Sequence, residues 1–193
     1  EYTIDHTAPS GSIAINSGDG YTNSTEVVIT VTASDNLTGI DGMQFMNQGG
    51  SWSGAEPLAA TKAWTLDAGD GTKQVLAQFT DGAGNNGQVA DSITLDQTAP
   101  ASSLTALADT TIVGTAIDLP FTASDTGSGI TSTALFVKTP GAGAFADSGL
   151  SVTGTSGTFN YTASAGNGLY EFATKATDNA SNAEADPAAA EVA

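Results

Sequence analysis

Along most of the chain, apolar and polar residues alternate with a period of two, which is the pattern of half-buried β-strands. Residues 26–33 place Val27, Ile29 and Val31 on one face of such a strand, and residues 73–80 place Val75 and Phe79 likewise. Few runs show the helical period of 3.6, and glycine is frequent, at 23 of 193 residues. The pattern therefore predicts an all-β protein.

Glycine-rich turn signals, such as GDG at residues 18–20, separate the predicted strands at regular spacing. Pro120 lies inside one predicted strand and indicates a sheet edge or a bulge there. Pro187 predicts an incomplete last strand, and Asp91, on the apolar face of its run, is expected near a strand end or bulge. The strands are predicted at residues 11–16, 26–33, 41–47, 57–60, 62–67, 73–80 and 88–95, and again at 101–107, 116–123, 131–138, 143–147, 156–163, 168–177 and 183–191.

The two halves of the chain repeat one another. The pentapeptide DHTAP at residues 5–9 returns as DQTAP at residues 96–100, and each copy follows a strand-like run. Internal repeats of this kind indicate a tandem array. The repeat predicts one domain at residues 6–96 and a second at 97–193, with residues 1–5 as the tail of a preceding repeat or a linker.

Two further motifs recur at matching positions. SDNLTGI at residues 34–40 matches SDTGSGI at 124–130, and DGAGN at 81–85 matches DNASN at 178–182. Together with the D-x-T-A-P joint, they resemble the bacterial immunoglobulin-like repeats of large secreted and cell-surface proteins. The resemblance implies two tandem immunoglobulin-like β-sandwiches of about seven antiparallel strands each. Ser181 departs from the family pattern, which favours glycine at that position.

The charge balance limits the classes of partner. There are 21 acidic residues against 4 lysines, which gives a net charge of −17. Phosphate backbones are bound by clustered Lys and Arg, so we expect no nucleic-acid partner. No apolar run approaches the ~20 residues that span a bilayer, and we expect no direct membrane insertion. The chain has no cysteine, which excludes disulfides and thiolate metal sites.

Strand parity predicts where the recurrent aspartates lie. In an antiparallel sandwich the connections alternate between the two ends, so the entry to the first strand, the loop after the second and the loop after the sixth share one end. Ca²⁺ takes oxygen ligands from such irregular loops, whereas Asx-turns would use the same carboxylates to accept hydrogen bonds from turn amides. Both interpretations stay open for the candidate metal ligands, which are Asp5, Asp35 and Asp81 in the first domain and Asp96, Asp125 and Asp178 in the second.

Signals of catalysis are weak. His6 is the only histidine, and no G-x-S-x-G sequence is present. The resemblance to bacterial immunoglobulin-like repeats implies instead a non-catalytic, extracellular structural or spacer module of an adhesin-like surface protein, and we expect no required cofactor, with Ca²⁺ as an open case. Its partners would be neighbouring repeats of the same chain, glycans or other surface proteins. Two alternatives remain: a carbohydrate-binding or accessory module of a secreted hydrolase, in which Trp52 would stack on a sugar, and a subunit of a surface filament or layer.

Overall fold

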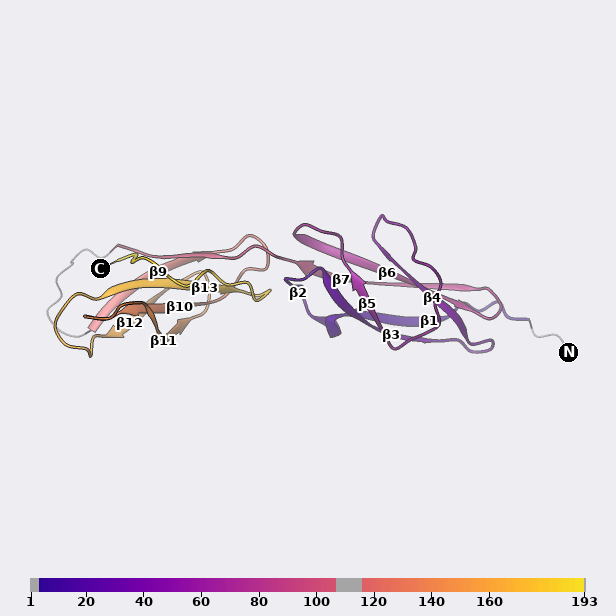
Figure 1. Cartoon of the computed structure of the whole chain (residues 1–193). Coiled ribbons are helices and arrows are strands. Elements are labelled where there is room, and N and C mark those ends of the chain that lie inside the picture. Colours follow the sequence, from indigo (N-terminus) through magenta and orange to yellow (C-terminus); the bar gives the residue numbers. More distant parts are fainter. Residues whose placement is uncertain (1–3, 107–115, 193) are drawn as a thin grey trace. The chain divides into compact units, whose positions relative to one another are not determined.

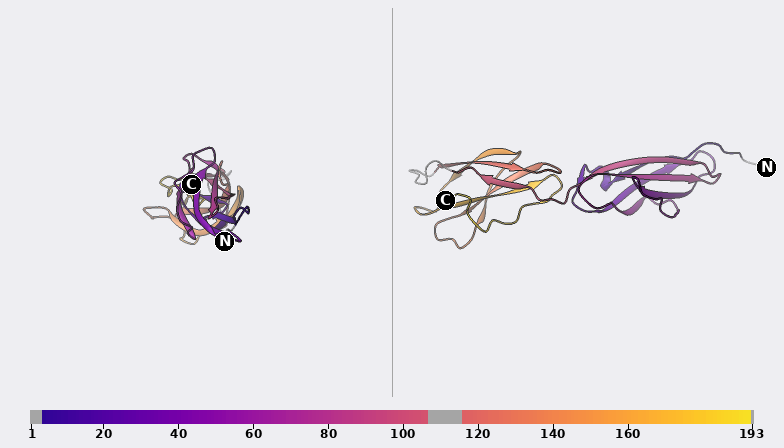
Figure 2. Two further views of the ribbon diagram at one scale, coloured as in Figure 1. Left: turned by 90° about the vertical axis from the view of Figure 1, so that its right-hand side faces the viewer. Right: turned by 90° about the horizontal axis from the view of Figure 1, so that it is seen from above.

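The computed structural model describes residues 4–106 and 116–192. The chain divides into two compact units, Glu1–Asp96 and Gln97–Ala193. Residues 1–3 of the predicted tail and residue 107 of a predicted strand lie outside the described residues. Each unit is a β-sandwich, as the alternating pattern predicts, and its strands run along the long direction of that unit (Figure 2). No helix among the described residues has the length and apolar character needed to cross a membrane.

Unit 1 packs a three-stranded sheet on a four-stranded sheet (Figure 1). The sheet orders are β1-β3-β5 and β2-β7-β6-β4. All neighbouring strands are antiparallel except β2, which pairs with the end of β7 in parallel. The strands are β1 (Ser10–Ile15), β2 (Tyr21–Thr22), β3 (Glu26–Ser34), β4 (Ile40–Asn47), β5 (Thr61–Thr65), β6 (Gly71–Asp81) and β7 (Asn86–Leu95), with one 3-10 turn at Asn16–Gly18.

Unit 2 has two three-stranded sheets, with the orders β12-β9-β8 and β11-β10-β13. The strands are β8 (Ala101–Leu104), β9 (Ala116–Ser124), β10 (Ile130–Lys138), β11 (Ala146–Val152), β12 (Ser156–Thr162) and β13 (Glu171–Asp178). The sheet that holds β13 has no counterpart of β7 among the described residues. In this respect the architecture of unit 2 differs from that of unit 1.

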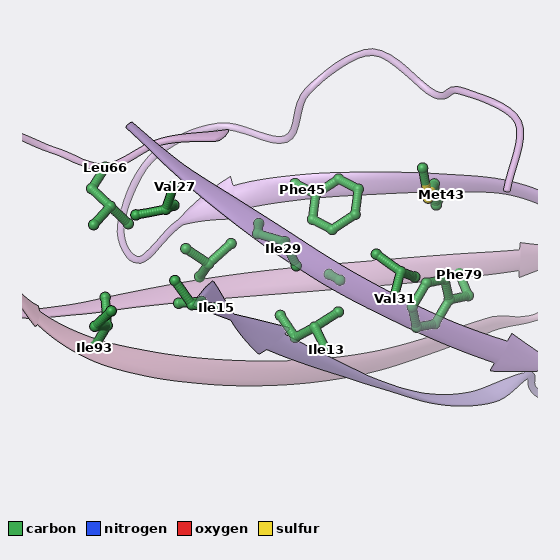
Figure 3. Packing of buried hydrophobic residues seen from close by; sticks show 12 residues of the cluster. Ile13, Ile15, Val27, Ile29, Val31, Met43, Phe45, Leu66, Phe79 and Ile93 are labelled. Atoms are coloured by element: carbon green, nitrogen blue, oxygen red, sulfur yellow. The ribbon is translucent and has the colours of Figure 1, made fainter. Parts of the chain in front are cut away.

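Each unit buries its own apolar core, as the alternation predicts. Ile29 and Val31 of β3 face Phe45 and Phe79 of the opposite sheet in unit 1 (Figure 3), and all four are at least 96% buried, with exposures of 0%, 4%, 0% and 0%. Fully burying one such side chain stabilises the fold by about 1.5–3 kcal/mol. The core residues of unit 2 are Leu104, Ile117, Leu119, Phe121, Ala123, Leu135, Val137, Phe159, Phe172 and Ala176.

The chain enters and leaves each unit at opposite ends. In unit 1, Asp5 lies beside Asp81 at the end of β6, whereas Leu95 pairs with Gly71 at the start of β6. In unit 2, Val192 bridges Phe172 near the start of β13. Its entry segment packs at the other end of that strand, where the N–H of residue 102 meets the side chain of residue 184.

Several predicted strands are wrong. Residues 57–60 form no strand, and only Glu56 bridges Met43 of β4. The strand predicted at 143–147 begins at residue 146 and continues to 152. The last strand, at 183–191, is incomplete, as Pro187 predicts: only bridges at Ala183 and, just past its end, Val192 are present among the described residues, because Pro187 lacks the N–H that continued pairing would use. The two-residue strand β2 was too short for periodicity to predict.

Pro120 is not on an edge strand, contrary to the prediction. It lies in β9, the central strand of its sheet, and pairs with Thr158 of β12 in regular register. Its carbonyl accepts a hydrogen bond from the N–H of Thr105, just beyond the end of β8. Because the N and O atoms of one strand residue point to the same side, the missing N–H faces the place where β8 has ended. The proline therefore removes no hydrogen bond to β12.

Asp91 lies in the middle of β7 and not at a strand end or bulge, which corrects the prediction. It pairs with Val75 in regular register. Its Oδ2 accepts a hydrogen bond from the N–H of Ile15 at 2.8 Å. A carboxylate can occupy the inward face of the strand here because a main-chain donor of β1 meets it.

Candidate metal centre

Three aspartates meet at the entry end of unit 1. Asp5 precedes β1, Asp35 follows β3, and Asp81 is the last residue of β6. One carboxylate oxygen from each lies within 4.8 Å of the others. Asp5 and Asp81 are buried and Asp35 is half-buried. The convergence that strand parity predicts is therefore confirmed, and we call these residues the first acidic trio.

The equivalent aspartates also converge. Asp125 follows β9 and Asp178 ends β13, and their carboxylate oxygens lie within 4.8 Å of each other in unit 2; with Asp96, the last residue of unit 1, they make up the second predicted trio. Asp96 and Asp178 are buried, and Asp125 is half-buried. The predicted convergence is therefore confirmed for Asp5, Asp35 and Asp81 within unit 1, and for Asp125 and Asp178 within unit 2.

Both trios also cap turns, as the Asx-turn interpretation predicts. Asp35 Oδ2 accepts the N–H groups of Leu37 at 2.8 Å and Thr38 at 2.9 Å. Asp81 Oδ1 accepts the N–H of Asn85 at 2.8 Å, and its Oδ2 accepts the Asn85 side-chain amide at 2.8 Å. The carboxylates are therefore held in fixed orientations by their own turns.

One oxygen in each trio is left over. Oδ1 of Asp35 and Oδ1 of Asp125 are buried and accept no hydrogen bond from the residues that the structure describes. A buried carboxylate oxygen without a donor is costly, and a cation beside it would offset that cost. Calcium binds six to eight oxygens and tolerates irregular loop geometry. The donor set and the two unpartnered oxygens therefore fit Ca²⁺.

The electrostatics of the first trio favour the ionised forms. The backbone N–H of Leu37 holds the pKa of Asp35 below its usual 3.8 and, with other turn amides, outweighs the opposing effect of burial. Burial acts to raise the pKa of Asp81, but hydrogen bonds from Asn85 and Ala83 outweigh it, so that this pKa also lies below 3.8. The charge of Asp35 opposes the ionisation of Asp81. Near neutral pH the turns thus hold like charges side by side.

The lysines are engaged elsewhere. Lys62 pairs with Glu56, Lys138 with Glu171 and Lys175 with Asp186. The Nζ of the fourth lysine donates to a backbone carbonyl, that of residue 68. No lysine of the chain is therefore paired with either trio in these hydrogen bonds and ion pairs.

The other residues singled out by the sequence differ in their burial. Trp64 packs on the core, with its ring 5.8 Å from that of Phe45, and its Nε1 donates to Asn47 Oδ1 at 2.7 Å. Trp52 is half-buried in its loop, and His6 is exposed. Ser181 takes the left-handed conformation that the family pattern assigns to glycine, with φ of 72°.

Two glutamates of unit 2 were missed by the sequence analysis. Glu184 accepts hydrogen bonds from the N–H groups of Ser102 and Ala176. Glu191 accepts them from the N–H groups of Leu104 and Thr174. The one available signal was Pro187 between them, which interrupts the last strand and leaves donors of β13 without a main-chain partner.

No protein-family model matches the chain, and no curated protein matches it. Among solved structures, the fibronectin(III)-like modules of Clostridium thermocellum CbhA align over 91% of this chain and 90% of theirs, with 17% identity and a TM-score of 0.54. A tetra-tandem repeat in the extending region of a large adhesion protein aligns over 91% of this chain and 47% of its own, with 19% identity and a TM-score of 0.36. The PKD1 domain of the Vibrio cholerae metalloprotease PrtV aligns over 47% of this chain and 99% of its own, with 21% identity and a TM-score of 0.38. The chain thus has the fold of fibronectin III-like and immunoglobulin-like β-sandwich modules, which is consistent with the resemblance of its motifs to bacterial immunoglobulin-like repeats.

Proposed function

We propose that this chain is an extracellular spacer in a repeat-containing, adhesin-like surface protein. The observation that carries the proposal is the path of the chain through each unit, which enters beside the acidic turns and leaves at the opposite end. A module with this path adds length each time it is repeated. A non-catalytic role agrees with solved structures of the same fold.

We further propose that the first acidic trio binds Ca²⁺. Its support is the approach of three carboxylates within 4.8 Å, together with the unpartnered buried Oδ1 of Asp35. The bound ion would neutralise the like charges. Because Asp5 precedes β1 while Asp35 and Asp81 end other strands, the three residues would then tie the entry segment to two turns of the sandwich.

Calcium binding is tested by thermal unfolding of the full chain in calcium and in chelator. Both tryptophans, Trp52 and Trp64, lie in unit 1, so their fluorescence reports on that unit alone. For extracellular modules a dissociation constant of about 0.1–1 mM is expected. Calcium at ten times that value then stabilises unit 1 by about 1.4 kcal/mol. Superimposable curves would contradict the proposal.

A matched pair of variants locates the effect. Asp35→Asn removes one ligand charge, and we expect it to abolish the calcium-dependent shift. Asp19→Asn removes an exposed charge from a turn near β2, at the other end of unit 1, and should keep the shift. A calcium response that survives Asp35→Asn would place the ion elsewhere.

The spacer role is tested by measuring a distance along the chain. The protein has no cysteine, so two introduced cysteines can be labelled without background. Ser10→Cys and Asn167→Cys put dyes on exposed residues of the two units. Single-molecule energy transfer should give one narrow distance distribution in calcium. A broad distribution with and without calcium would show a flexible tether and overturn the spacer proposal.

The same protein also tests the alternatives. Glycan-array binding that is lost in Trp52→Ala would indicate a carbohydrate-binding module. Light scattering that shows concentration-dependent growth would indicate a filament subunit. We expect no binding on the array and a monomer at every concentration.

A further inference from the structure

The first strand and the last segment of each unit run in the same direction. In unit 1, Pro9 lies against Gly87 and Ile15 is bonded to Asp91, so β1 and β7 (Figure 1) advance together, and the short β2 also pairs with β7 in parallel. In unit 2, the hydrogen bonds join residue 102 to 184 and residue 104 to 191, so both segments advance together. A pull on the two ends of a unit therefore slides these segments past each other. All hydrogen bonds between the two segments then carry the force at the same time and must break together, instead of one after another.

Unit 1 makes this connection mainly with its backbone. The N–H of Thr94 donates to the carbonyl of Gly20 at 3.1 Å, and the N–H of Asp96 donates to the carbonyl of Thr22 at 2.9 Å. One side chain contributes, because Asp91 Oδ2 accepts the N–H of residue 15 at 2.8 Å. The connection therefore involves the second half of β7, from Asp91 to its end.

Unit 2 makes the connection with two glutamate side chains. Glu184 accepts the N–H of Ser102 at 2.6 Å and the N–H of Ala176 at 2.6 Å, one oxygen for each. The Ser102 hydroxyl donates to the same carboxylate. The Glu184 side chain therefore links β8 to β13 through hydrogen bonds.

Glu191 repeats the arrangement farther along. Its Oε2 accepts the N–H of Leu104 on β8, and its Oε1 accepts the N–H of Thr174 on β13 at 2.9 Å. The Thr174 hydroxyl also donates to it, at 3.0 Å. Among the described residues, the β-bridges from this segment to β13 lie at Ala183 and Val192, outside the stretch between the two glutamates. Hydrogen bonds to a charged acceptor are about twice as strong as neutral ones.

We propose that Glu184 and Glu191 act as clasps in unit 2: their carboxylates hold its first strand to its last segment when the chain is stretched. They take the place of the main-chain bonds that β7 makes in unit 1. This inference deepens the proposed spacer function and rests on it for its biological meaning. The rupture force itself is a property of the fold and is measurable whether or not calcium binds.

The test is single-molecule stretching of the full chain between two handle domains of known rupture force. The wild-type chain should give two rupture events, one for each unit. Glu184→Gln and Glu191→Gln each replace one of the two acceptor oxygens by an NH₂ group, which cannot accept a hydrogen bond from an N–H group. Each should lower the force of one event and raise its unfolding rate about ten- to hundredfold, the factor that corresponds to hydrogen bonds to charged groups.

Two controls make the result specific. Glu171→Gln removes a carboxylate that pairs with Lys138 and lies outside the clasps, so both rupture forces should stay unchanged. Asp91→Asn should weaken the other event and leave the clasped unit unaffected. Folding of each variant is checked by circular dichroism and by the number of rupture events.

Rupture-force distributions of the two clasp variants that superimpose on the wild type would overturn the proposal. An equal loss of force in Glu171→Gln would overturn it as well. Stretching in calcium and in chelator separates the two proposals. A calcium-independent force that depends on Glu184 and Glu191 supports the clasps even where the metal proposal fails.

Discussion

The two units share the same sandwich fold but join their first strand to their last segment in different ways. In unit 1 glycines stand two residues after the joint proline and two residues after the turn asparagine, at Gly11 and Gly87. A side chain at Gly87 would collide with the carbonyl of Pro9, so the segment before β1 lies directly on β7. In unit 2 the corresponding residues are Ser102 and Glu184, which are joined by hydrogen bonds. A fold can thus keep its plan while it exchanges backbone contact for side-chain bonds.

The same exchange affects strand pairing. β7 pairs with β6 along its whole length of 10 residues, from Asn86 to Leu95. In unit 2 the N–H groups of Thr174 and Ala176 bond to carboxylates and not to a strand. Because buried N–H groups must find acceptors, the loss of main-chain pairing in unit 2 required other acceptors, and the two glutamates supply them.

The largest effect is expected from a core residue that differs between the units. Phe79 is fully buried in unit 1, and the corresponding residue of unit 2 is Ala176. Unit 2 compensates with Phe121 and Phe159, whose rings stack 4.8 Å apart. Phe79→Ala should therefore lower the free energy of unfolding of unit 1 by about 3–5 kcal/mol. Tryptophan fluorescence in urea measures this, with the half-exposed Val28→Ala as the control; equal losses in both variants would contradict the assignment.

A methyl group at the close approach in unit 1 should have the next largest effect. Gly87→Ala forces β7 away from Pro9, and we expect a loss of about 1–3 kcal/mol, as for overpacked cores. The same change at Gly20, where an added Cβ meets nothing within 4 Å, tests the intrinsic effect of alanine. If Gly20→Ala costs as much as Gly87→Ala, the close approach is not what makes glycine necessary.

The turns after β6 and β13 should respond to reciprocal substitutions. Gly84 and Ser181 both have positive φ, of 90° and 72°. For a residue with a Cβ, this conformation costs about 1–2 kcal/mol of stability. Ser181→Gly should therefore stabilise unit 2, and Gly84→Ser should destabilise unit 1, each by about 1 kcal/mol. Hydrogen exchange of the two turns resolves the units, and shifts of the same sign would exclude this explanation.

The smallest effect is expected from acid. The pKa values of Asp35 and Asp81 are lowered in the folded state from the usual 3.8. Their contribution to stability is therefore complete above pH 3.8, where both carboxyl groups are ionised in the folded and in the unfolded chain. It is lost as the pH falls through the lower folded values, because the unfolded chain then binds protons first. Urea midpoints followed by tryptophan fluorescence should decline less steeply below pH 3.8 in Asp35→Asn than in Asp19→Asn.

Much of the architecture was predictable from residues close together in the sequence. Alternation places Val31 and Phe79 on inward faces because successive strand residues point to opposite sides, whatever their neighbours are. The recurring D-x-T-A-P, S-D and D-x-x-x-N motifs placed six aspartates at strand ends. Strand parity predicted that those of one unit meet, and the structure confirms this for Asp5, Asp35 and Asp81 and for Asp125 and Asp178.

The tertiary structure alone decided which strand lies beside which. Periodicity describes a face and carries no information about the neighbours, so Pro120 was expected at an edge and lies in a central strand. Asp91 and Glu184 are placed by donors far away in the sequence, on β1 and β8. Such bonds form because every buried N–H group needs an acceptor. Which N–H groups lack a main-chain acceptor is decided only when the strands have packed together, so the local sequence does not show it.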